Sequence, residues 1–380
     1  MKICVYAICK DEDKYVNQWF KNVMSADYIA VLDTGSKEPF YTGLLAIRDR
    51  INSDAGYEKV IIDQKVITPW RFDVARNESM KLIPADADLC LCTDFDELLT
   101  PNWCSIIKSH WKGESRVLYQ YAWTHTETGL PAKIFTYDKC HKNDGKHFWK
   151  YPVHECISIG TIEQDLKEIK EDSCNIAEPV PFLEHYPDPE KIRQASYHDL
   201  LEIRAKEFPD EAFSYTYLIA QYFWEQKYEK VIDFGINKAL PHLIPHYDKD
   251  QATMPDVYTY IGDSYRALGK HDKALEFHTH CIAALPIARD GYLGCAWDYL
   301  YLNRPDKAIE MVQEAFKNGI HLHIWSEREF SWTYMPYVIL WLAYVCLQRT
   351  EVGNDYLQLA IQLGAPKAMI DDLRKGIKTS

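Results

Sequence analysis

Two carboxylates stand two residues apart in Asp94-Phe95-Asp96, directly after a run of apolar residues. Carboxylate oxygens are the ligands that hard divalent cations such as Mg²⁺ and Mn²⁺ prefer, and these cations often share their ligands with phosphate groups. The pair therefore predicts a metal site that also holds a phosphorylated ligand. An acidic turn without any ligand would have the same sequence, so the prediction depends on what surrounds the pair.

Two other polar segments precede this pair in the chain. Asp33 begins the segment Asp33-Thr34-Gly35-Ser36, and its carboxylate could accept hydrogen bonds from a nucleobase N–H or a ribose hydroxyl. Arg76 lies in residues 72–78, and a guanidinium group can bind a pyrophosphate through two parallel hydrogen bonds. The alternatives are a strand-to-loop turn for the first segment and a solvated helical turn for the second.

Short apolar runs alternate with helical patterns over the first half of the chain. Strands are predicted at residues 1–8, 28–32, 59–62 and 89–93. Helices are predicted at residues 11–24, with one apolar face, at residues 73–83, and from Glu97 onwards. Alternating strands and helices predict a parallel α/β sheet with crossover helices. Ligands bind such sheets outside the carboxyl ends of the strands, where the segments of Asp33 and Asp94 would both lie.

The second half of the chain has long helical patterns and a recurring spacing. A tyrosine is followed nine residues later by a small or β-branched residue in the pairs Tyr222/Val231, Tyr265/Ala274, Tyr299/Ala308 and Tyr344/Gly353. Ala274 and Ala308 are 34 residues apart. This pattern looks like tetratricopeptide repeats, in which two helices meet across a tight turn. The alternative is an unrelated helical bundle, but the recurring spacing favours repeats.

The polar segments, in this order, resemble those of family 2 glycosyltransferases, which have the GT-A fold. The resemblance runs through residues 8–12, 26–36, 75–79 and 87–99, and the pair His154-Glu155 and the later His185 match it too. Bacterial members with C-terminal tetratricopeptide repeats, including peptide S/O-glycosyltransferases of the bacteriocin type, are similar. The resemblance implies a Rossmann-like mixed sheet in residues 1–190, followed by an all-α tetratricopeptide-like domain in residues 195–380.

The resemblance also implies the roles of individual residues. The residues that would bind the UDP-sugar are Asp11, Asp33, Arg76 and Asp94. The residues that would bind Mn²⁺ or Mg²⁺ are Asp94, Asp96 and His185. The implied activity is an inverting, metal-dependent transfer of a hexose to a nucleophile on a peptide, protein or glycan acceptor.

This reaction needs positive charge at the leaving diphosphate and a base for the acceptor proton. A metal on Asp96, assisted by Arg76, would supply the charge. Glu155 is the expected base, with His154 and Asp138 as alternatives. Two aromatic residues, Trp123 and Trp149, are expected to stack on sugar rings.

Two rival hypotheses remain. Tetratricopeptide arrays usually bind peptides in a concave groove, so the chain could be a non-catalytic adaptor with a degenerate transferase domain. A zinc protein is the weaker rival, although five possible ligands lie within 17 residues. These are Cys140, His141, His147, His154 and Cys156.

Composition excludes several classes of protein. Of 380 residues 47% are hydrophobic and 26% charged, which excludes a mainly disordered or collagen-like chain. A net charge of -13 argues against non-specific binding of nucleic acid. No apolar run is long enough for a membrane span, and no signal peptide is expected at the start. We therefore expect a cytoplasmic protein whose 11 cysteines are reduced and mostly buried, with a homodimer through the repeats as a possible assembly.

Overall fold

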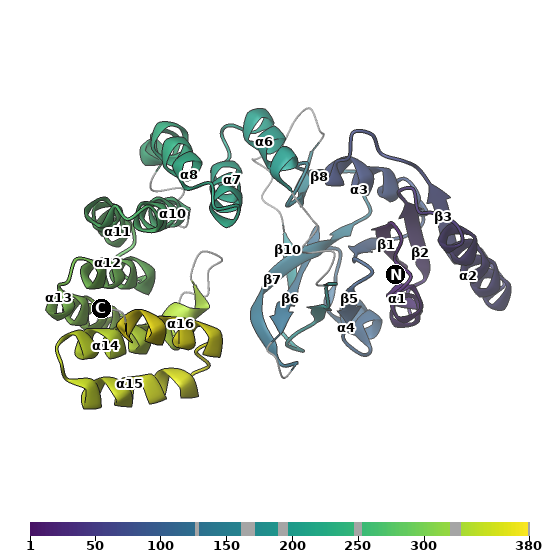
Figure 1. The fold of residues 1–380 in the computed structure, drawn as a ribbon. Coiled ribbons are helices and arrows are strands. Elements are labelled where there is room, and N and C mark those ends of the chain that lie inside the picture. Colours follow the sequence, from purple (N-terminus) through teal and green to yellow (C-terminus); the bar gives the residue numbers. More distant parts are fainter. Residues whose placement is uncertain (126–128, 161–171, 189–196, 247–252, 320–327, 379–380) are drawn as a thin grey trace. The chain divides into compact units, whose positions relative to one another are not determined.

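The computed structural model describes the chain except for residues 126–128, 161–171, 189–196, 247–252, 320–327 and 379–380. The chain divides into two compact units, Met1–Leu200 and Leu201–Ser380 (Figure 1). The predicted boundary between residues 190 and 195 lies outside the described residues. Each unit has a hydrophobic core of its own.

The first unit is built on a nine-stranded sheet with the strand order β3-β2-β1-β4-β7-β6-β11-β5, in which β10 also pairs with β6. Its strands are β1 (Ile3–Cys9), β2 (Tyr28–Asp33), β3 (Val60–Gln64), β4 (Leu89–Cys92), β5 (Glu97–Leu99), β6 (Arg116–His125), β7 (Pro131–Lys142), β10 (Ser173–Ile176) and β11 (Leu183–His185). The strands β8 (His147–Lys150) and β9 (Cys156–Ile159) form a separate antiparallel pair.

The sheet is mixed, as the resemblance implied, and not purely parallel. Strands β3, β2, β1 and β4 pair in parallel, as the alternation of strands and helices predicted. Strand β7, however, is antiparallel to both β4 and β6, because β6 and β7 follow each other along the chain and need no crossover helix to pair. The helix predicted from Glu97 is also wrong, since Glu97 begins the short strand β5.

In the described residues of the first unit, four helices accompany the sheet before the helix that contains Leu200: α1 (Val16–Val23), α2 (Phe40–Ala55), α3 (Phe72–Met80) and α4 (Trp103–His110). The apolar face predicted for the first helix is confirmed, because Val16, Trp19, Phe20 and Val23 are the buried residues of α1. Helix α2 was missed. Only Phe40, Leu44 and Ile51 of its 16 residues are buried, so its apolar periodicity is weak.

The two faces of the sheet bury different side chains, because successive residues of a strand point to opposite sides. On β1, Ile3, Val5 and Ala7 belong to the larger core on one face. Cys4 and Tyr6 belong to a smaller cluster on the other face, together with Trp149. Arg76, which is described below, packs on this second face against Trp149.

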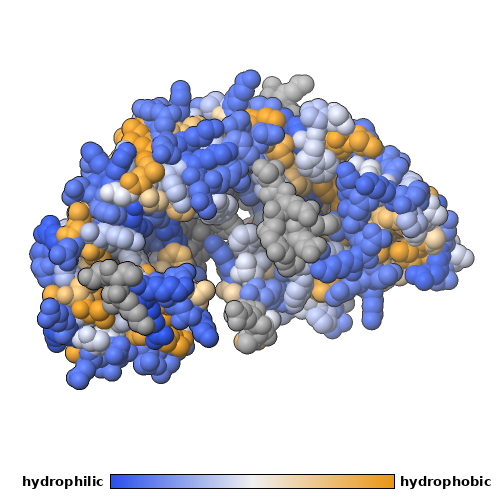
Figure 2. Space-filling model, in the orientation of Figure 1, coloured by the Kyte–Doolittle hydropathy of each residue, from blue (hydrophilic) through white to orange (hydrophobic). Residues whose placement is uncertain are grey.

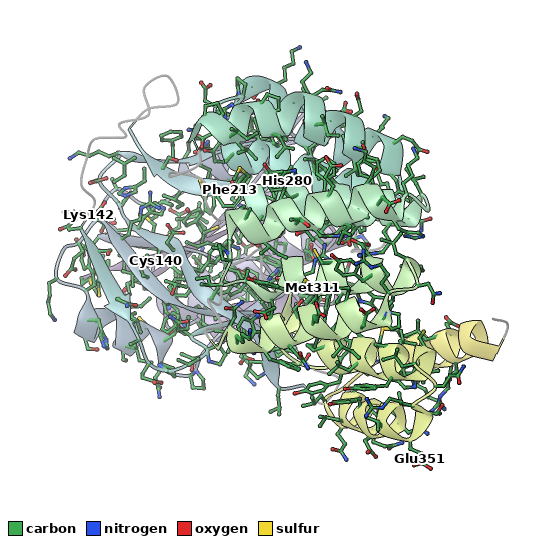
Figure 3. The ribbon with its side chains drawn as sticks, turned by 90° about the vertical axis from the view of Figure 1, so that its left-hand side faces the viewer. Cys140, Lys142, Phe213, His280, Met311 and Glu351 are labelled. Carbon is green, nitrogen blue, oxygen red and sulfur yellow. The ribbon has the colours of Figure 1, made fainter. Side chains whose placement is uncertain are left out.

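The second half of the chain is helical apart from its connections in the described parts. The helices are α6 (His198–Glu207), α7 (Ala212–Trp224), α8 (Tyr228–Phe234), α9 (Leu240–Leu243), α10 (Met254–Ala267), α11 (His271–Ala284), α12 (Arg289–Tyr301), α13 (Pro305–Lys317), α14 (Met335–Cys346), α15 (Thr350–Gln362) and α16 (Lys367–Lys378). Figure 3 shows their side chains, with Phe213 of α7, His280 of α11 and Glu351 of α15 labelled.

The same turn joins α7 to α8, α10 to α11, α12 to α13 and α14 to α15. The fourth residue after each repeat tyrosine has a left-handed backbone: Gln226 (φ 58°), Gly269 (φ 71°), Asn303 (φ 55°) and Gln348 (φ 58°). The next residue donates its N–H to the tyrosine carbonyl, over 2.8 to 2.9 Å in all four turns. The small residue nine positions after the tyrosine is buried in the second helix of each pair. The predicted repeat is therefore confirmed, and this turn explains its spacing.

These turns predict opposite effects for two substitutions. Gly269→Ala should lower the free energy of unfolding by about 1 kcal/mol, because an L-residue is strained at φ 71° and nothing else is close to the added methyl group. Gln348→Gly should raise it by up to about 1 kcal/mol, because the strain is already present there. Urea unfolding followed by helical circular dichroism measures both changes. Two changes of the same sign would contradict this explanation of the turns.

Hydrophilic side chains cover much of the face seen in Figure 2, with hydrophobic residues in separate patches. Among the described helices none has the length and apolar character to cross a membrane. All 11 cysteines are free thiols, and nine of them are buried, whereas Cys156 and Cys346 are exposed.

Candidate functional site

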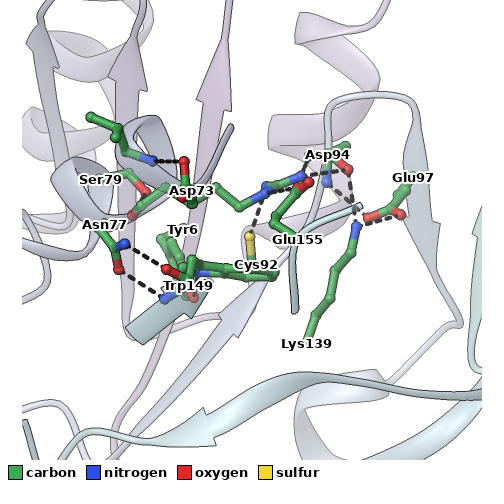
Figure 4. A network of polar contacts seen from close by, with 12 residues as sticks. Tyr6, Asp73, Asn77, Ser79, Cys92, Asp94, Glu97, Lys139, Trp149 and Glu155 are labelled. Atoms are coloured by element: carbon green, nitrogen blue, oxygen red, sulfur yellow. Dashed lines mark hydrogen bonds and ion pairs between the residues drawn. The ribbon is translucent and has the colours of Figure 1, made fainter. Parts of the chain in front are cut away.

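A buried arginine holds two carboxylates together beyond the carboxyl end of β4 (Figure 4). Arg76 lies on α3 and is 4% exposed. Its Nε donates to Oε1 of Glu155 over 2.5 Å, and its Nη2 donates to Oδ1 of Asp94 over 2.9 Å. Its Nη1 lies 3.1 Å from Sγ of Cys92. The structure therefore brings three of the predicted site residues into direct contact.

A buried lysine on β7 completes this cluster, and the sequence reasoning missed it. Lys139 donates from Nζ to Asp94 and to Glu97, over 3.0 Å in each case. Tyr121 donates its hydroxyl to Oε1 of Glu97, and the backbone N–H of Asp94 donates to Oε2, each over 2.8 Å. The sequence of β7 gave no clear signal, because the strand also contains Lys133, Asp138 and Lys142.

The protonation of the cluster follows from burial and pairing. Burial would raise the pKa of Asp94, but Arg76 and Lys139 outweigh this and hold the pKa well below its usual range. Burial raises the pKa of Glu97, and Lys139 only partly offsets the rise. Burial would lower the pKa of Lys139, but the two carboxylates keep it above the usual value. At neutral pH, Asp94 and Lys139 are therefore both charged.

An aromatic ring packs against the guanidinium group of Arg76. The guanidinium carbon lies 4.9 Å from the ring centre of Trp149. Nε1 of Trp149 donates to the hydroxyl of Tyr6 over 2.9 Å, and the side chain of Asn77 makes two 2.8 Å hydrogen bonds with the Trp149 backbone. Because Trp149 is only 2% exposed, the prediction that it stacks on a sugar is wrong. Trp123 is 37% exposed, and its predicted role stays a prediction.

The more accessible part of the site is a carboxylate and an imidazole. Oδ2 of Asp96 lies 3.4 Å from Nε2 of His185, and 26% and 20% of the two side chains are exposed. Nδ1 of His185 lies 3.3 Å from the carbonyl oxygen of Trp123. Burial would lower the pKa of His185, but Asp96 and Glu97 outweigh it and raise the pKa above its ordinary value.

These contacts decide which predicted metal ligands fit a cation. Asp94 does not fit, because Arg76 and Lys139 already occupy its two oxygens. Asp96 keeps a partly exposed carboxylate that could bind a cation, since Mg²⁺ commonly takes one or two protein carboxylates beside the phosphates of a bound substrate. The raised pKa of His185 favours the protonated imidazole, so its predicted metal binding stays a prediction. Within the described residues, no group of three or more His, Cys, Asp or Glu side chains could hold a metal ion by itself.

The two aspartates predicted near the nucleotide both hold the loop that follows β2. Oδ1 of Asp33 accepts hydrogen bonds from the backbone N–H groups of Gly35 and Ser36 and from Gln64, over 2.8 to 3.0 Å. Oδ1 of Asp11 accepts from the N–H of Lys37 over 2.9 Å. Both carboxylates are therefore engaged within the domain, and their predicted contacts with a nucleotide stay predictions.

The three candidate bases have different surroundings. Glu155 is paired with Arg76, whereas Asp138 is paired with Arg116 over 2.5 Å on β7 and takes no part in the cluster. His154 is exposed, and its ring centre lies 6.2 Å from that of Tyr197. The sequence reasoning missed Tyr197, whose pKa is raised by burial and by the carboxylates of the cluster. No local pattern indicates this tyrosine, because it follows the cluster by more than 40 residues.

The zinc hypothesis is not supported by the positions of its proposed ligands. His141 is buried, 3.0 Å from the hydroxyl of Tyr6, and its ring centre lies 4.9 Å from that of His147. Burial and the neighbouring His147 lower the pKa of His141 to about 3. Cys140 points into the larger core on the opposite face of the sheet, and Cys156 is exposed.

A second buried charged cluster lies inside the repeat region. His278 on α11 is fully buried, and its Nδ1 lies 2.5 Å from Oδ2 of Asp298. Arg266 donates to Oδ1 of Asp298 over 3.0 Å and also to Asp263, and Arg328 donates to Oδ2 of Asp263 over 2.8 Å. The cluster therefore connects α10, α11, α12 and the segment before α14.

This second cluster predicts a pH dependence of stability. Burial would lower the pKa of His278, but Asp263 and Asp298 outweigh it, and the pKa rises above the unfolded value of about 6.5. The stabilisation is therefore complete below about pH 6.5 and is lost as the pH rises through the folded pKa. The free energy of unfolding of the repeat region should therefore fall as the pH rises above about 6.5. Urea unfolding followed by circular dichroism tests this, and His278→Gln should lack the fall. An increase with pH would contradict the assignment.

No family model matches the sequence, and no curated protein matches it. Several solved structures of helical-repeat proteins resemble the chain. MamA of Desulfovibrio magneticus RS-1 is 14% identical, with 46% of this chain and 89% of that chain covered and a TM-score of 0.35. A thermophilic TPR protein of Thermus thermophilus is 16% identical, with 48% and 87% covered and a TM-score of 0.33. The second TPR of Spaghetti, bound to the HSP90 peptide SRMEEVD, is 16% identical, with 30% and 97% covered and a TM-score of 0.26.

These findings correct the sequence-based identification. Membership of the family 2 glycosyltransferases, and similarity to bacteriocin-type peptide glycosyltransferases, is wrong, because no family model matches and the structures named above are helical-repeat proteins. The short polar segments suggested the wrong family because their residues also fit structural roles. Asp33 holds a loop, and Asp94 holds two buried cations. The coarser prediction is confirmed: a mixed sheet is followed by pairs of helices that are joined by one recurring turn.

Proposed function

We propose that the chain is a partner-binding protein whose repeat region, Leu201–Ser380, carries the binding site. One observation supports this: the repeat region contains a pocket of about 780 Å³ that is open to solvent. Its lining combines aromatic and charged side chains, namely Phe223, Trp224, Tyr260, Asp263, Arg266, Tyr301, Arg328 and Phe330, with Ala267 and Gly269. Ligand pockets in proteins typically have this size and this mixture of aromatic rings with a few polar groups.

The exposure of two of these rings is the strongest part of this observation. Trp224 is 69% exposed and Tyr301 is 57% exposed, although both border the pocket. Large apolar side chains that a fold leaves in water often mark a surface that a partner covers. Trp and Tyr are also the residues that contribute most to binding energy in known interfaces.

Binding at this pocket can be tested on the full chain. The indole N–H signal of Trp224 is assigned by comparison with Trp224→Phe, and two sets of probes, short peptides and oligosaccharides, are titrated. We expect one set to shift this signal in a saturable way. If neither set moves it while the chain stays folded, the proposed function is wrong.

A second candidate function is the transfer of a hexose from a UDP-sugar to a peptide, protein or glycan. It is favoured by the accessible pair Asp96 and His185 beside the buried cations Arg76 and Lys139. Cationic side chains at a leaving diphosphate stabilise its developing charge. Under this candidate, the sheet would have the GT-A arrangement, and Glu155 would accept the acceptor proton after parting from Arg76.

The predicted cation, Mn²⁺ or Mg²⁺, belongs to this second candidate. Asp96 and His185 would hold it together with the donor phosphates, and it would supply further positive charge there. The predicted cytoplasmic location and a homodimer through the repeats are independent of the reaction and stay predictions.

Turnover of UDP-sugars separates the two candidates. UDP-glucose, UDP-N-acetylglucosamine and UDP-galactose are each incubated with the full chain and Mn²⁺ or Mg²⁺, and the released UDP is measured. Transfer chemistry predicts release that Asp96→Asn lowers by about 100-fold or more, the scale of losing one group that stabilises a transition state. The exposed Asp13→Asn is the matched control and should have no effect. Absence of both UDP binding and UDP release would leave only the binding function.

A further inference from the structure

The rim of the repeat-region pocket carries flat rings that are held in place. The ring of Tyr301 is stacked on His271, with centres 4.5 Å apart and planes only 1° from parallel. This contact covers one face of the tyrosine ring, while 57% of the residue remains exposed. Trp224 presents an even larger exposed ring on the same pocket. The pocket therefore offers aromatic faces for a flat apolar surface to stack on.

The floor of the pocket carries N–H donors whose charge is already balanced. Asp263 is 7% exposed and accepts hydrogen bonds from both Arg266 and Arg328. Behind them, Asp298 binds Arg266 and His278. The two guanidinium groups and a protonated His278 thus face the carboxylates of Asp263 and Asp298. A third carboxylate, Asp290, accepts a hydrogen bond from the backbone N–H of Arg328 over 3.4 Å.

One of these arginines is positioned for recognition. The guanidinium carbon of Arg328 lies 5.6 Å from the ring centre of Tyr260 and 5.9 Å from that of Phe330. Its Nη1 is bound to Asp263, and 27% of the side chain is exposed. A planar guanidinium fixed in this way can direct its remaining N–H groups at two neighbouring oxygen atoms.

We propose that this pocket binds a neutral glycan, whose sugar rings stack on Trp224 and Tyr301 and whose hydroxyl oxygens accept hydrogen bonds from Arg328. The inference rests on the proposed function, because it names the class of ligand that the binding site takes. A pyranose ring has an apolar face of C–H groups and a rim of hydroxyls, so it matches aromatic walls and fixed donors at the same time. It carries no charge, which suits a floor whose charges are compensated.

An acidic peptide is the rival ligand, and the electrostatics favour it less. Its carboxylate would meet a floor where Asp263 already accepts hydrogen bonds from both arginines, and where Asp298 binds Arg266 from behind. The whole chain also has a net charge of -13, which repels an acidic partner as it approaches. A neutral ligand is not repelled by the carboxylates of the floor or by the net charge of the chain.

The test titrates the full chain with maltotriose, cellotriose and chitotriose, up to about 20 mM, because small ligands with few contacts often bind weakly. Binding is followed by tryptophan fluorescence and by the Trp224 indole signal. A short acidic peptide that contains tyrosine is the parallel probe. We expect at least one trisaccharide to bind, with an affinity that changes little when salt is added, since no net charge is involved.

Variants show whether this binding occurs in the pocket. Trp224→Ala should weaken trisaccharide binding by about 10-fold, the equivalent of one lost aromatic stacking contact. Arg328→Lys keeps a positive charge beside Asp263 but loses the planar fork, so it should weaken binding by several-fold. Phe213→Ala is the matched control, because Phe213 is an exposed aromatic residue on α7 that does not line the pocket.

Three other outcomes would overturn the glycan inference, and one of them would also overturn the binding function. If the acidic peptide shifts the Trp224 signal and no trisaccharide does, the glycan inference is overturned while the binding function stands. If no probe binds to the folded chain, both are overturned. If a trisaccharide binds equally well to Trp224→Ala and to the unchanged chain, it binds elsewhere, and the inference is overturned.

Discussion

Arg76→Met lowers the free energy of unfolding of the first unit by about 3–5 kcal/mol, the range observed when one partner of a buried ion pair is removed. Methionine has a similar length and no charge, so the substitution removes the cation that binds both Glu155 and Asp94. It also removes the guanidinium from the ring of Trp149. Lys139 stays beside Asp94 but has no contact with Glu155. Urea unfolding followed by near-ultraviolet circular dichroism measures the change.

The control is Arg48→Met on α2, where the arginine is paired with its exposed neighbour Asp49. Exposed ion pairs contribute little, so this variant should change stability by less than about 1 kcal/mol. Adding Glu155→Gln to Arg76→Met should restore part of the loss, because it removes the carboxylate left without a partner. A loss of similar size in both arginine variants would contradict the importance assigned to burial.

Gly294→Ala lowers the free energy of unfolding of the repeat region by about 1–3 kcal/mol, the usual cost of overpacking a core. A methyl group at Gly294 would lie 2.4 Å from Cδ2 of His278, much closer than a normal contact. The imidazole cannot easily move away, because Asp298 holds Nδ1 and Gly262 on α10 packs against its other side. Thermal unfolding followed by helical circular dichroism measures the effect.

Gly376→Ala on α16 serves as the control for this prediction. No atom lies within 4 Å of a methyl group added there, so the gain in helix propensity should dominate and raise stability by up to about 1 kcal/mol. An unchanged stability in Gly294→Ala would mean that His278 can move, and would also weaken the pH dependence predicted for its cluster.

The two clusters in these stability predictions have the same arrangement of charges. In each, one arginine binds two carboxylates. Arg76, which is buried, binds Asp94 and Glu155, and Arg266, which is partly exposed, binds Asp263 and Asp298. Such clusters cost desolvation energy, so they are stable only when every charge has a partner. In the repeat region, the cluster also forms the floor of the pocket, which connects its protonation to ligand binding.

Local sequence patterns were sufficient to predict most of the regular secondary structure named here. Short continuous apolar runs identified β1, β2, β3 and β4, and the apolar face of α1 was predicted residue by residue. The nine-residue spacing from Tyr265 to Ala274 and its counterparts identified the repeats, because one turn geometry imposes that spacing. These features depend on contacts between residues close in the chain, so a sequence pattern carries them.

The chemistry of the charged residues was not readable in the same way. Asp94 looked like a metal ligand, but Lys139, 45 residues later, occupies it instead. Tyr197 and Arg328 come from segments without any motif, and they reach their clusters only through the packing of distant elements. A carboxylate in a sequence can hold a metal, a loop or an arginine. Which of these it does depends on the groups that folding brings within 3 Å of its oxygens, and those groups are set by long-range contacts that no short pattern records.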